Sequence, residues 1–209
     1  MKKLIDFYWS FRSPYCYLAM PRAKGLRDEY GVEFRMRVIY PLAVRFPDFF
    51  VDAPPQRISY PRLDRARVAE FLGLPFADPD PDPLVLGPDK RPVDDQPYIH
   101  RLTRLGIDAS RQDKGFEFCD CVSEIIWSGR VSGWPSGNHL KGAAAAAGLD
   151  LADMDRRIEA NAHDFDREAA ANFADLSAAG HWGVPTFVLD GEPFFGQDRL
   201  NILEWRLSA

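Results

Sequence analysis

A short segment near the amino terminus combines residue types that stabilise a thiolate. Residues 3–11 are apolar and aromatic, as in a strand, and Ser13, Pro14, Tyr15 and Cys16 follow. Serine is a favoured N-cap and proline a favoured first helical residue, so we predict that a helix begins here. A helix N-terminus offers unpaired N–H groups and a positive dipole end, and both favour a thiolate. The segment therefore predicts a thiolate-binding corner, although capping alone also explains Ser13.

A second segment, GVPTF at residues 183–187, leads into a strand near the carboxyl terminus. A proline at a strand start can follow a cis peptide bond, which is essentially confined to proline. A cis bond before Pro185 would leave the N–H and C=O of Val184 free to pair with an extended peptide. An ordinary trans proline at a sheet edge is the alternative.

A third segment opens the last helix with Gly196, Gln197 and Asp198. Asp198 would either cap this helix or face the ammonium group of a ligand. Two further residues are accessory candidates. Cys16 is either a small buried apolar residue or a thiol that forms a mixed disulfide. Trp182 lies next to the GVPTF segment and could line a pocket for an aromatic substrate.

The elements that would position these segments follow from hydrophobic periodicity. Residues 3–11, a helix at 14–30 ended by Gly31, and a strand at 32–39 predict a βαβ unit. A loop at 41–55 and an extended, proline-rich connector at 78–83 follow. Strands at 186–189 and 192–195, with Asp190-Gly191 as a hairpin turn, and a helix at 199–207 close the chain. Helices are predicted at residues 60–72, 96–105, 110–128, 136–147, 151–160 and 164–179, with Asp108 or Ser110 starting the third of them.

This order predicts an α/β fold whose two halves flank a long helical stretch. We expect the core to comprise residues 1–55 and 181–209, and an all-helical insertion to span 56–180.

Composition limits the function classes. The chain has 209 residues, 46% hydrophobic and 27% charged, which suits a packed domain. Its net charge of −5 disfavours nucleic-acid binding, and it lacks the roughly 18 consecutive apolar residues of a membrane span. We also expect no signal peptide, since polar residues break the first apolar run, and hence a cytoplasmic protein. Three cysteines predict no disulfide framework, and the histidine spacing predicts no metal site.

Taken in order, SPYC at 13–16, GVPTF at 183–187 and DGEPFFGQDRL at 190–200 resemble the DsbA-like branch of the thioredoxin superfamily. More narrowly, the chain resembles the 2-hydroxychromene-2-carboxylate isomerases and kappa-class glutathione transferases. Asp6-Phe7-Tyr8 on the first strand, and Tyr60, Asp64 and Arg67 before the sequence LGLP at 72–75, add to the resemblance. Residues 41–55 depart from the family pattern, so no role is carried over to them.

The resemblance implies a thioredoxin-like fold (βαβ…ββα) with a large all-helical insertion, a homodimer and bound glutathione. It makes Ser13, which replaces the first cysteine of the thioredoxin motif, the catalytic residue that hydrogen-bonds the glutathione sulfur. Val184, before Pro185, would pair with the cysteinyl part of glutathione. Gln197 and Asp198 would bind its γ-glutamyl end.

The resemblance thus predicts a glutathione-dependent isomerase acting on a small, unsaturated, aromatic-derived carboxylic acid. Reversible addition of a thiolate to an electron-poor double bond would permit cis/trans isomerisation without consuming glutathione. Three alternatives remain open: a kappa-type glutathione transferase, a thiol-disulfide oxidoreductase that uses Cys16, and a non-enzymatic binding protein with the same fold.

Overall fold

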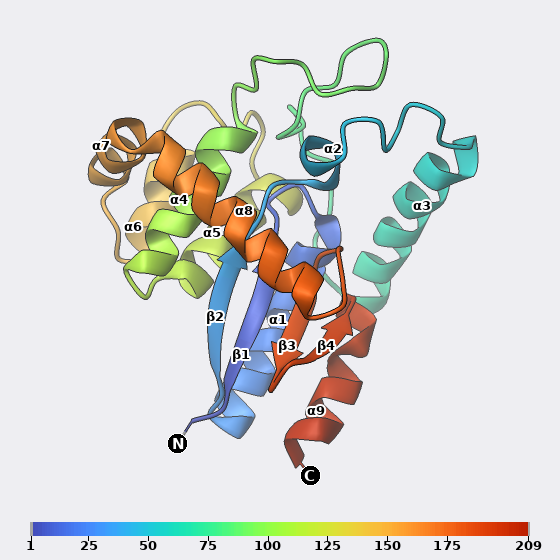
Figure 1. The fold of residues 1–209 in the computed structure, drawn as a ribbon, viewed down its shortest axis with the longest axis vertical. Helices are drawn as coiled ribbons and strands as arrows, with labels where there is room; N and C mark the ends of the chain where they lie inside the picture. The colour runs from blue at the N-terminus through green and yellow to red at the C-terminus, as the bar shows by residue number, and fades with distance from the viewer. Residues whose placement is uncertain (1, 209) are drawn as a thin grey trace.

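The computed structural model describes residues 2–208, and Figure 1 shows its ribbon. Four strands form one sheet in the order β2-β1-β3-β4. Strand β1 pairs in parallel with β2 and antiparallel with β3, and β3 pairs antiparallel with β4. The elements are β1 (Leu4–Trp9), α1 (Pro14–Tyr30), β2 (Glu33–Val38), α2 (Leu42–Arg45), α3 (Pro55–Leu72), α4 (Ile99–Arg111), α5 (Gly115–Trp127), α6 (His139–Ala146), α7 (Leu151–Ala160), α8 (Ala162–Ala178), β3 (Thr186–Leu189), β4 (Glu192–Phe195), a 3₁₀ turn (Gln197–Arg199) and α9 (Leu200–Ser208). The predicted βαβ…ββα order with inserted helices is confirmed.

The two faces of the sheet are covered by different helices. In Figure 1, α8 crosses in front of the strands while α1 lies behind them. Leu176 of α8 packs with Tyr8 and Val188 on the front face. On the rear face, the rings of Phe7 and Phe187 are in contact, with their centroids 4.2 Å apart and their planes tilted by 34°. The alternation of strand side chains between faces therefore builds two cores on one sheet.

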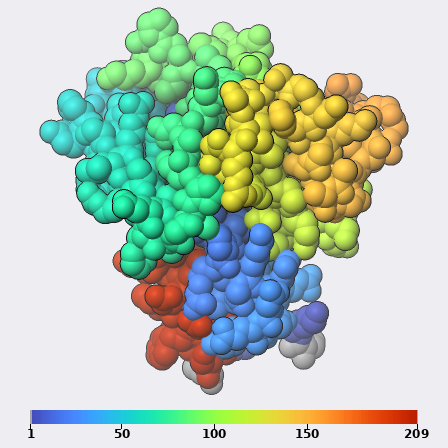
Figure 2. Space-filling view, turned by 180° about the vertical axis from the view of Figure 1, so that it is seen from behind, coloured from blue at the N-terminus to red at the C-terminus, as the bar shows by residue number. Residues whose placement is uncertain are grey.

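Seen from behind, the helical part lies above the carboxyl-terminal helix and the first helix. Figure 2 shows α3 in teal beside α1 in blue and the carboxyl-terminal segment in red. Helix α1 contacts α3, α5 and α9. The helix that carries Ser13 is thus held between the sheet and the inserted helices. The predicted division into 1–55 with 181–209 and 56–180 stays a prediction, and α8 from the inserted range covers the sheet directly.

Local signals at both ends of α1 act as predicted. The Ser13 side chain accepts a hydrogen bond from the Cys16 N–H, and Pro14 is the first helical residue. Gly31 ends the helix at φ 63°, in the left-handed region that favours glycine. The hairpin turn also forms as predicted, with Asp190 at φ 51° and Gly191 at φ 83°.

The predicted helix end at residue 105 and the predicted helix start at Asp108 or Ser110 are wrong, because one helix runs through all three positions. Asp108 does not start a helix; α4 continues to Arg111, and α5 begins at Gly115. The buried Asp108 carboxylate instead accepts two 2.8 Å hydrogen bonds from Arg157 of α7. The Ser110 hydroxyl donates to the Gly106 carbonyl one turn earlier at 2.8 Å, as serine does inside helices.

The segment predicted as a loop at 41–55 contains α2, and α3 begins at Pro55 rather than at residue 60. Proline at a first helical position needs no hydrogen-bonded N–H, so Pro55 can start the helix. Because α3 begins at Pro55, Arg57 and Ile58 belong to the helix that borders the site.

None of the described helices is long and apolar enough to cross a membrane.

Candidate functional site

Two adjoining cavities lie where α1 begins, beside the segment that leads into β3. The smaller has a volume of about 420 Å³ and the larger about 640 Å³. Tyr15, Val184 and Phe195 line both, so they form the shared wall. The structure thus brings the three predicted segments to one place, although they lie far apart in the sequence.

Ser13 lines the larger cavity at the amino-terminal end of α1. Its hydroxyl oxygen accepts the Cys16 N–H at 3.3 Å, which is the N-cap bond. The same hydroxyl approaches the Val184 carbonyl oxygen as a donor at 3.5 Å. That second contact is long, so its proton can be redirected to a stronger acceptor, such as a thiolate. Capping and ligand binding are compatible in Ser13, because they use different parts of one hydroxyl.

The Val184–Pro185 peptide bond is cis, which decides between the two alternatives that the sequence left open. Within residues 2–208, the Val184 N–H and C=O make no main-chain hydrogen bond. The chain turns away before β3 pairing begins, and the Pro185 carbonyl already accepts the Gly196 N–H at 2.9 Å. Backbone N–H and C=O groups normally find hydrogen-bond partners within the protein. Val184 therefore offers one donor and one acceptor to an extended peptide ligand.

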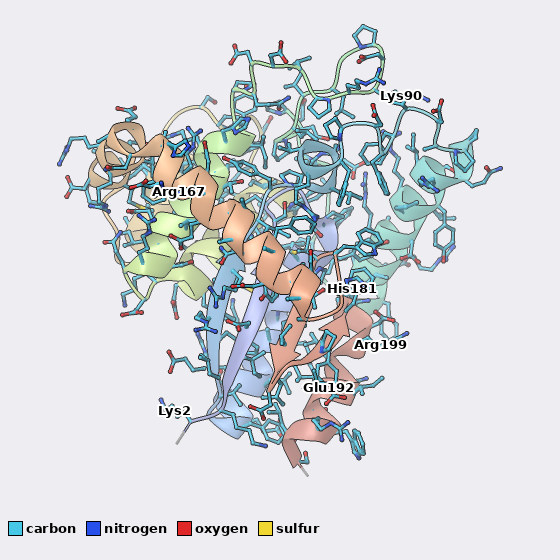
Figure 3. All side chains as sticks on the ribbon, in the orientation of Figure 1. Lys2, Lys90, Arg167, His181, Glu192 and Arg199 are labelled. Atoms are coloured by element: carbon cyan, nitrogen blue, oxygen red, sulfur yellow. The ribbon has the colours of Figure 1, made fainter. Side chains whose placement is uncertain are left out.

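Gln197 and Asp198 line the smaller cavity together with Tyr60 and Asp64 of α3. Asp198 caps no helix; it is exposed and pairs with Arg199 at 2.6 Å. Figure 3 labels Arg199 at the top of the carboxyl-terminal helix, on the side that faces α3.

Asp64 is a site residue to which the sequence analysis gave no role. Its Oδ2 accepts a 2.7 Å hydrogen bond from the Tyr15 hydroxyl, and this bond joins α3 to α1. Burial and the neighbouring Asp64 raise the pKa of Tyr15, so its phenol stays protonated as the donor. The spacing of Tyr60, Asp64 and Arg67 marked this helix, but only the packing of α3 on α1 places Asp64 at a cavity.

The two cavities differ in charge. The smaller one is lined by the carboxylates of Asp64 and Asp198, and no arginine or lysine of the described part of the chain lines it. The larger one is lined by five arginines and two aspartates: Arg12, Arg45, Arg57, Arg62, Arg65, Asp78 and Asp82. An ammonium group is favoured in the smaller cavity and an anion in the larger.

The aspartates of the larger cavity neutralise two of its arginines. Arg12 forms a two-pronged pair with Asp82 at 2.9 and 3.0 Å, and Arg65 pairs with Asp78. Asp78 and Asp82 lie in the proline-rich segment at 78–83, where extended backbone was predicted. That segment is therefore tied to the site rather than free at the surface.

Arg45 is the most enclosed of the remaining arginines. Its Nε and Nη1 donate to the carbonyls of Tyr40 at 2.8 Å and Trp182 at 2.9 Å. Its guanidinium lies 4.3 Å from the ring centroid of Phe173. Burial lowers the pKa of Arg45 to about 10, so it remains a cation at neutral pH. No carboxylate within residues 2–208 pairs with it.

Aromatic rings form much of the larger cavity's wall, including Phe49, Phe50, Trp127, Trp182 and Phe195. Trp182, the accessory candidate, is 49% exposed and lies 6.5 Å from Phe49 between ring centroids. Phe49 and Phe50 belong to the divergent segment 41–55, from which no role was carried over.

His181 organises this wall. Its ring stacks with both Trp182 and Phe195, at centroid distances of 5.6 and 4.0 Å. The Gly183 N–H donates to His181 Nδ1 at 3.0 Å. Burial lowers the pKa of His181, which keeps the ring neutral and Nδ1 free to accept. Gly183 is needed here, because a Cβ would lie 2.7 Å from the Phe195 ring. Figure 3 shows His181 in the loop between α8 and β3.

Cys16 does not face either cavity. It is fully buried beneath the first turn of α1, and burial raises its pKa to about 12. The interpretation of Cys16 as a small buried residue agrees with this environment. A thiol in this position is a poor nucleophile, because the thiolate is the reactive form.

Known proteins were compared with this chain and with its fold. No family model matches the sequence. A 2-hydroxychromene-2-carboxylate isomerase from Pseudomonas putida is 25% identical over 210 residues, covering 96% of this chain and 92% of that protein. One from Sphingobium xenophagum is 26% identical over 220 residues, covering 98% and 97%. This chain is a distant, nearly full-length relative of these isomerases.

Solved structures agree on the fold. A structure of a 2-hydroxychromene-2-carboxylate isomerase superposes with a TM-score of 0.72 at 23% identity, covering 98% of this chain and 94% of that one. A probable DsbA oxidoreductase from Streptomyces coelicolor gives 0.68 at 18% identity, covering 99% and 88%. The cytosolic disulfide reductase DsbM from Pseudomonas aeruginosa, in its structure with GSH, gives 0.62 at 19%, covering 99% and 100%. The chain therefore has the thioredoxin-like DsbA fold with an inserted helical domain.

Proposed function

We propose that this protein is a glutathione-dependent isomerase of an unsaturated, aromatic-derived carboxylic acid. The observation that carries the proposal is the position of Ser13. It stands at a helix N-terminus where a cavity lined by carboxylates adjoins one lined by arginines and aromatic rings. The similarity to curated isomerases over nearly the whole chain supports the same reaction class.

The residues at the site fit glutathione. Its γ-glutamyl end carries an ammonium group, which suits Asp64 and Asp198 in the smaller cavity. Its cysteinyl unit is an extended peptide, which suits the N–H and C=O of Val184, since neither makes a main-chain hydrogen bond within residues 2–208. Its glycine carboxylate suits the arginine-lined cavity beyond the shared wall. This assignment extends the predicted ligand set of Gln197 and Asp198 by one residue, Asp64.

When bound, glutathione supplies a thiolate that adds reversibly to an electron-poor double bond and leaves again after rotation about the former double bond. Ser13 donates a hydrogen bond to the sulfur, and the N-terminal end of α1 favours its negative charge. Phe49 and Trp182 hold an aromatic ring against the larger cavity's wall. Arg45 orients a carboxylate with a guanidinium fixed by two carbonyls.

The serine at position 13 also argues for this chemistry over disulfide exchange. No intramolecular disulfide can join Ser13 to Cys16, and Cys16 is buried with a raised pKa. A transferase would use the same site but retain glutathione in the product. Isotopically labelled glutathione separates the two, since label recovered in the product indicates transfer.

The test is calorimetric titration of glutathione into wild type, Asp198→Ala and the matched control Asp95→Ala. Asp95 is exposed and lines neither cavity. Loss of one charge-assisted contact should weaken binding about tenfold in Asp198→Ala and leave the control unchanged. An absence of binding at millimolar glutathione in the wild type would contradict the proposal. Turnover of benzylidene-type acids, followed by NMR with and without glutathione, then tests the isomerase activity itself.

The homodimer and the cytoplasmic location remain predictions. Sedimentation at micromolar concentration tests the first, and a strictly monomeric species would exclude the homodimer.

A further inference from the structure

The larger cavity holds more positive charge than its own carboxylates neutralise. Of its five arginines, Arg12 and Arg65 pair with Asp82 and Asp78. The other three, Arg45, Arg57 and Arg62, form no ion pair with any carboxylate within residues 2–208. The cavity therefore presents three cations that no carboxylate of the described residues neutralises.

These three arginines lie at different places around the cavity. Arg45 is on α2, where the carbonyls of Tyr40 and Trp182 hold its guanidinium. Arg57 and Arg62 are exposed residues on the first turns of α3. Arg57 lies 5.3 Å from the ring centroid of Phe49, so one cation already stands beside an aromatic wall residue. A ring held against Phe49 would thus meet positive charge from both α2 and α3.

The buried hydroxyl of Ser10, on the wall of the same cavity, also indicates a polar ligand. Ser10 lines the larger cavity, is 1% exposed, and its hydroxyl has no hydrogen-bond partner among the described residues. Buried hydroxyls are nearly always hydrogen-bonded, so an unpartnered one beside a cavity points to a polar ligand group. Its main-chain carbonyl accepts the Ser13 N–H at 3.0 Å, which places it next to the proposed catalytic serine.

We propose that the second substrate is an aromatic compound carrying two anionic groups, recognised by Arg45 from one side and by Arg57 and Arg62 from the other. The proposal deepens the proposed function and rests on it for the glutathione part. The glycine carboxylate of glutathione brings a single negative charge to three unpaired arginines, which leaves positive charge for two more anions. Six aromatic residues on the wall supply the apolar surface for the ring.

The experiment compares two probes of matched shape, trans-cinnamate with one carboxylate and 4-carboxy-trans-cinnamate with two. Each is titrated calorimetrically into the full chain without glutathione. We expect the dicarboxylate to bind about tenfold more tightly, because each added arginine–carboxylate pair contributes roughly that factor. The preference for the dicarboxylate should shrink as the salt concentration rises, since Arg57 and Arg62, the rim arginines, are exposed to solvent.

Variants locate the effect. Arg57→Gln and Arg62→Gln should each reduce dicarboxylate affinity several-fold, and the double variant should remove the preference over cinnamate. Arg167→Gln is the control with the same change in net charge. Arg167 pairs with Asp164 on α8, toward the far end of that helix from His181 in Figure 3. Both rim arginines are exposed, so these variants should fold; thermal unfolding checks this.

Equal affinity of the two probes within twofold would overturn the proposal. An equal loss in Arg167→Gln and in Arg57→Gln would also overturn it, because the preference would then be general attraction to a charged protein. The result is separable from the glutathione test. A preference for the dicarboxylate without glutathione binding would support the anion site and contradict the glutathione mechanism. Glutathione binding without a preference for the dicarboxylate would contradict only the two-anion substrate.

Discussion

The environment of Cys16 gives a quantitative prediction about its reactivity. The side chain is fully buried under the first turn of α1, and burial raises its pKa from an ordinary 9.0 to about 12. A pKa higher by about three lowers the thiolate fraction at neutral pH roughly a thousandfold. A thiolate of higher pKa is also more nucleophilic, which offsets roughly half of this loss, so the reaction of Cys16 with a thiol reagent should be about 30-fold slower than that of a free thiol before any steric protection is counted.

The assay is timed alkylation with iodoacetamide at pH 7.5, followed by mass spectrometry of peptides. Cys121 is only partly buried and serves as the internal reference, while Cys119 is fully buried like Cys16. We expect Cys121 to be modified first and Cys16 to react only after unfolding in denaturant. The companion variant, Cys16→Ala, should keep its turnover and lose about 1–2 kcal/mol of stability, because a small apolar group leaves a packed core.

Two results would refute this reasoning. Modification of Cys16 in the folded protein at a rate close to that of Cys121 would show that the thiol is accessible. A large loss of turnover in Cys16→Ala, with the protein still folded, would show that the thiol takes part in catalysis. Either result would favour the oxidoreductase alternative over the isomerase.

Three further predictions concern the site and the sheet. Ser13→Ala should lower the free energy of unfolding by about 1 kcal/mol through loss of the N-cap, and should lower turnover about a hundredfold. Denaturant titration measures the first effect and steady-state kinetics the second. A loss of stability without a loss of turnover would show that Ser13 acts only as a helix cap. Gly183→Ala should displace the Phe195 ring, because the new Cβ would lie 2.7 Å from it; weakened glutathione binding in calorimetry is the expected readout, and unchanged affinity would contradict it. Burial raises the pKa of Asp6, but its bonds to Arg35 and Arg37 outweigh burial and hold it below the ordinary 3.8. The stability contributed by Asp6 is thus present above about pH 4 and is lost as pH falls through its folded-state pKa. Asp6→Asn should therefore be less stable than wild type at pH 7, and the difference should shrink as the pH falls below about 4. An unchanged difference would argue against the pairing.

The sequence was most informative where a structural role is local. Ser13-Pro14 at the start of α1, Gly31 at its end and Asp190-Gly191 in the hairpin each act through their own backbone or nearest neighbours. Such signals do not depend on the rest of the fold, so they could be recognised in the chain alone.

The predictions failed where a distant partner decides the outcome. Aspartate is a favoured residue at a helix start, yet Arg157 of α7 binds the Asp108 carboxylate and α4 continues past this residue. Arg45 belongs to a segment that reads as a loop, yet α2 forms there and carries it to the larger cavity. No local pattern records these pairings, because they form only after the helices pack.

The sequence by itself therefore determined the fold, the helix N-terminus with Ser13, and the residues of the Val184–Pro185 and Gln197–Asp198 segments. Only the tertiary structure decided that these segments meet at two adjoining cavities, that Asp64 joins one of them, and that the other is lined by three arginines without a carboxylate partner in residues 2–208. The physical reason is that a strand or cap depends on neighbouring residues, whereas the charge of a cavity depends on side chains brought together from separate elements.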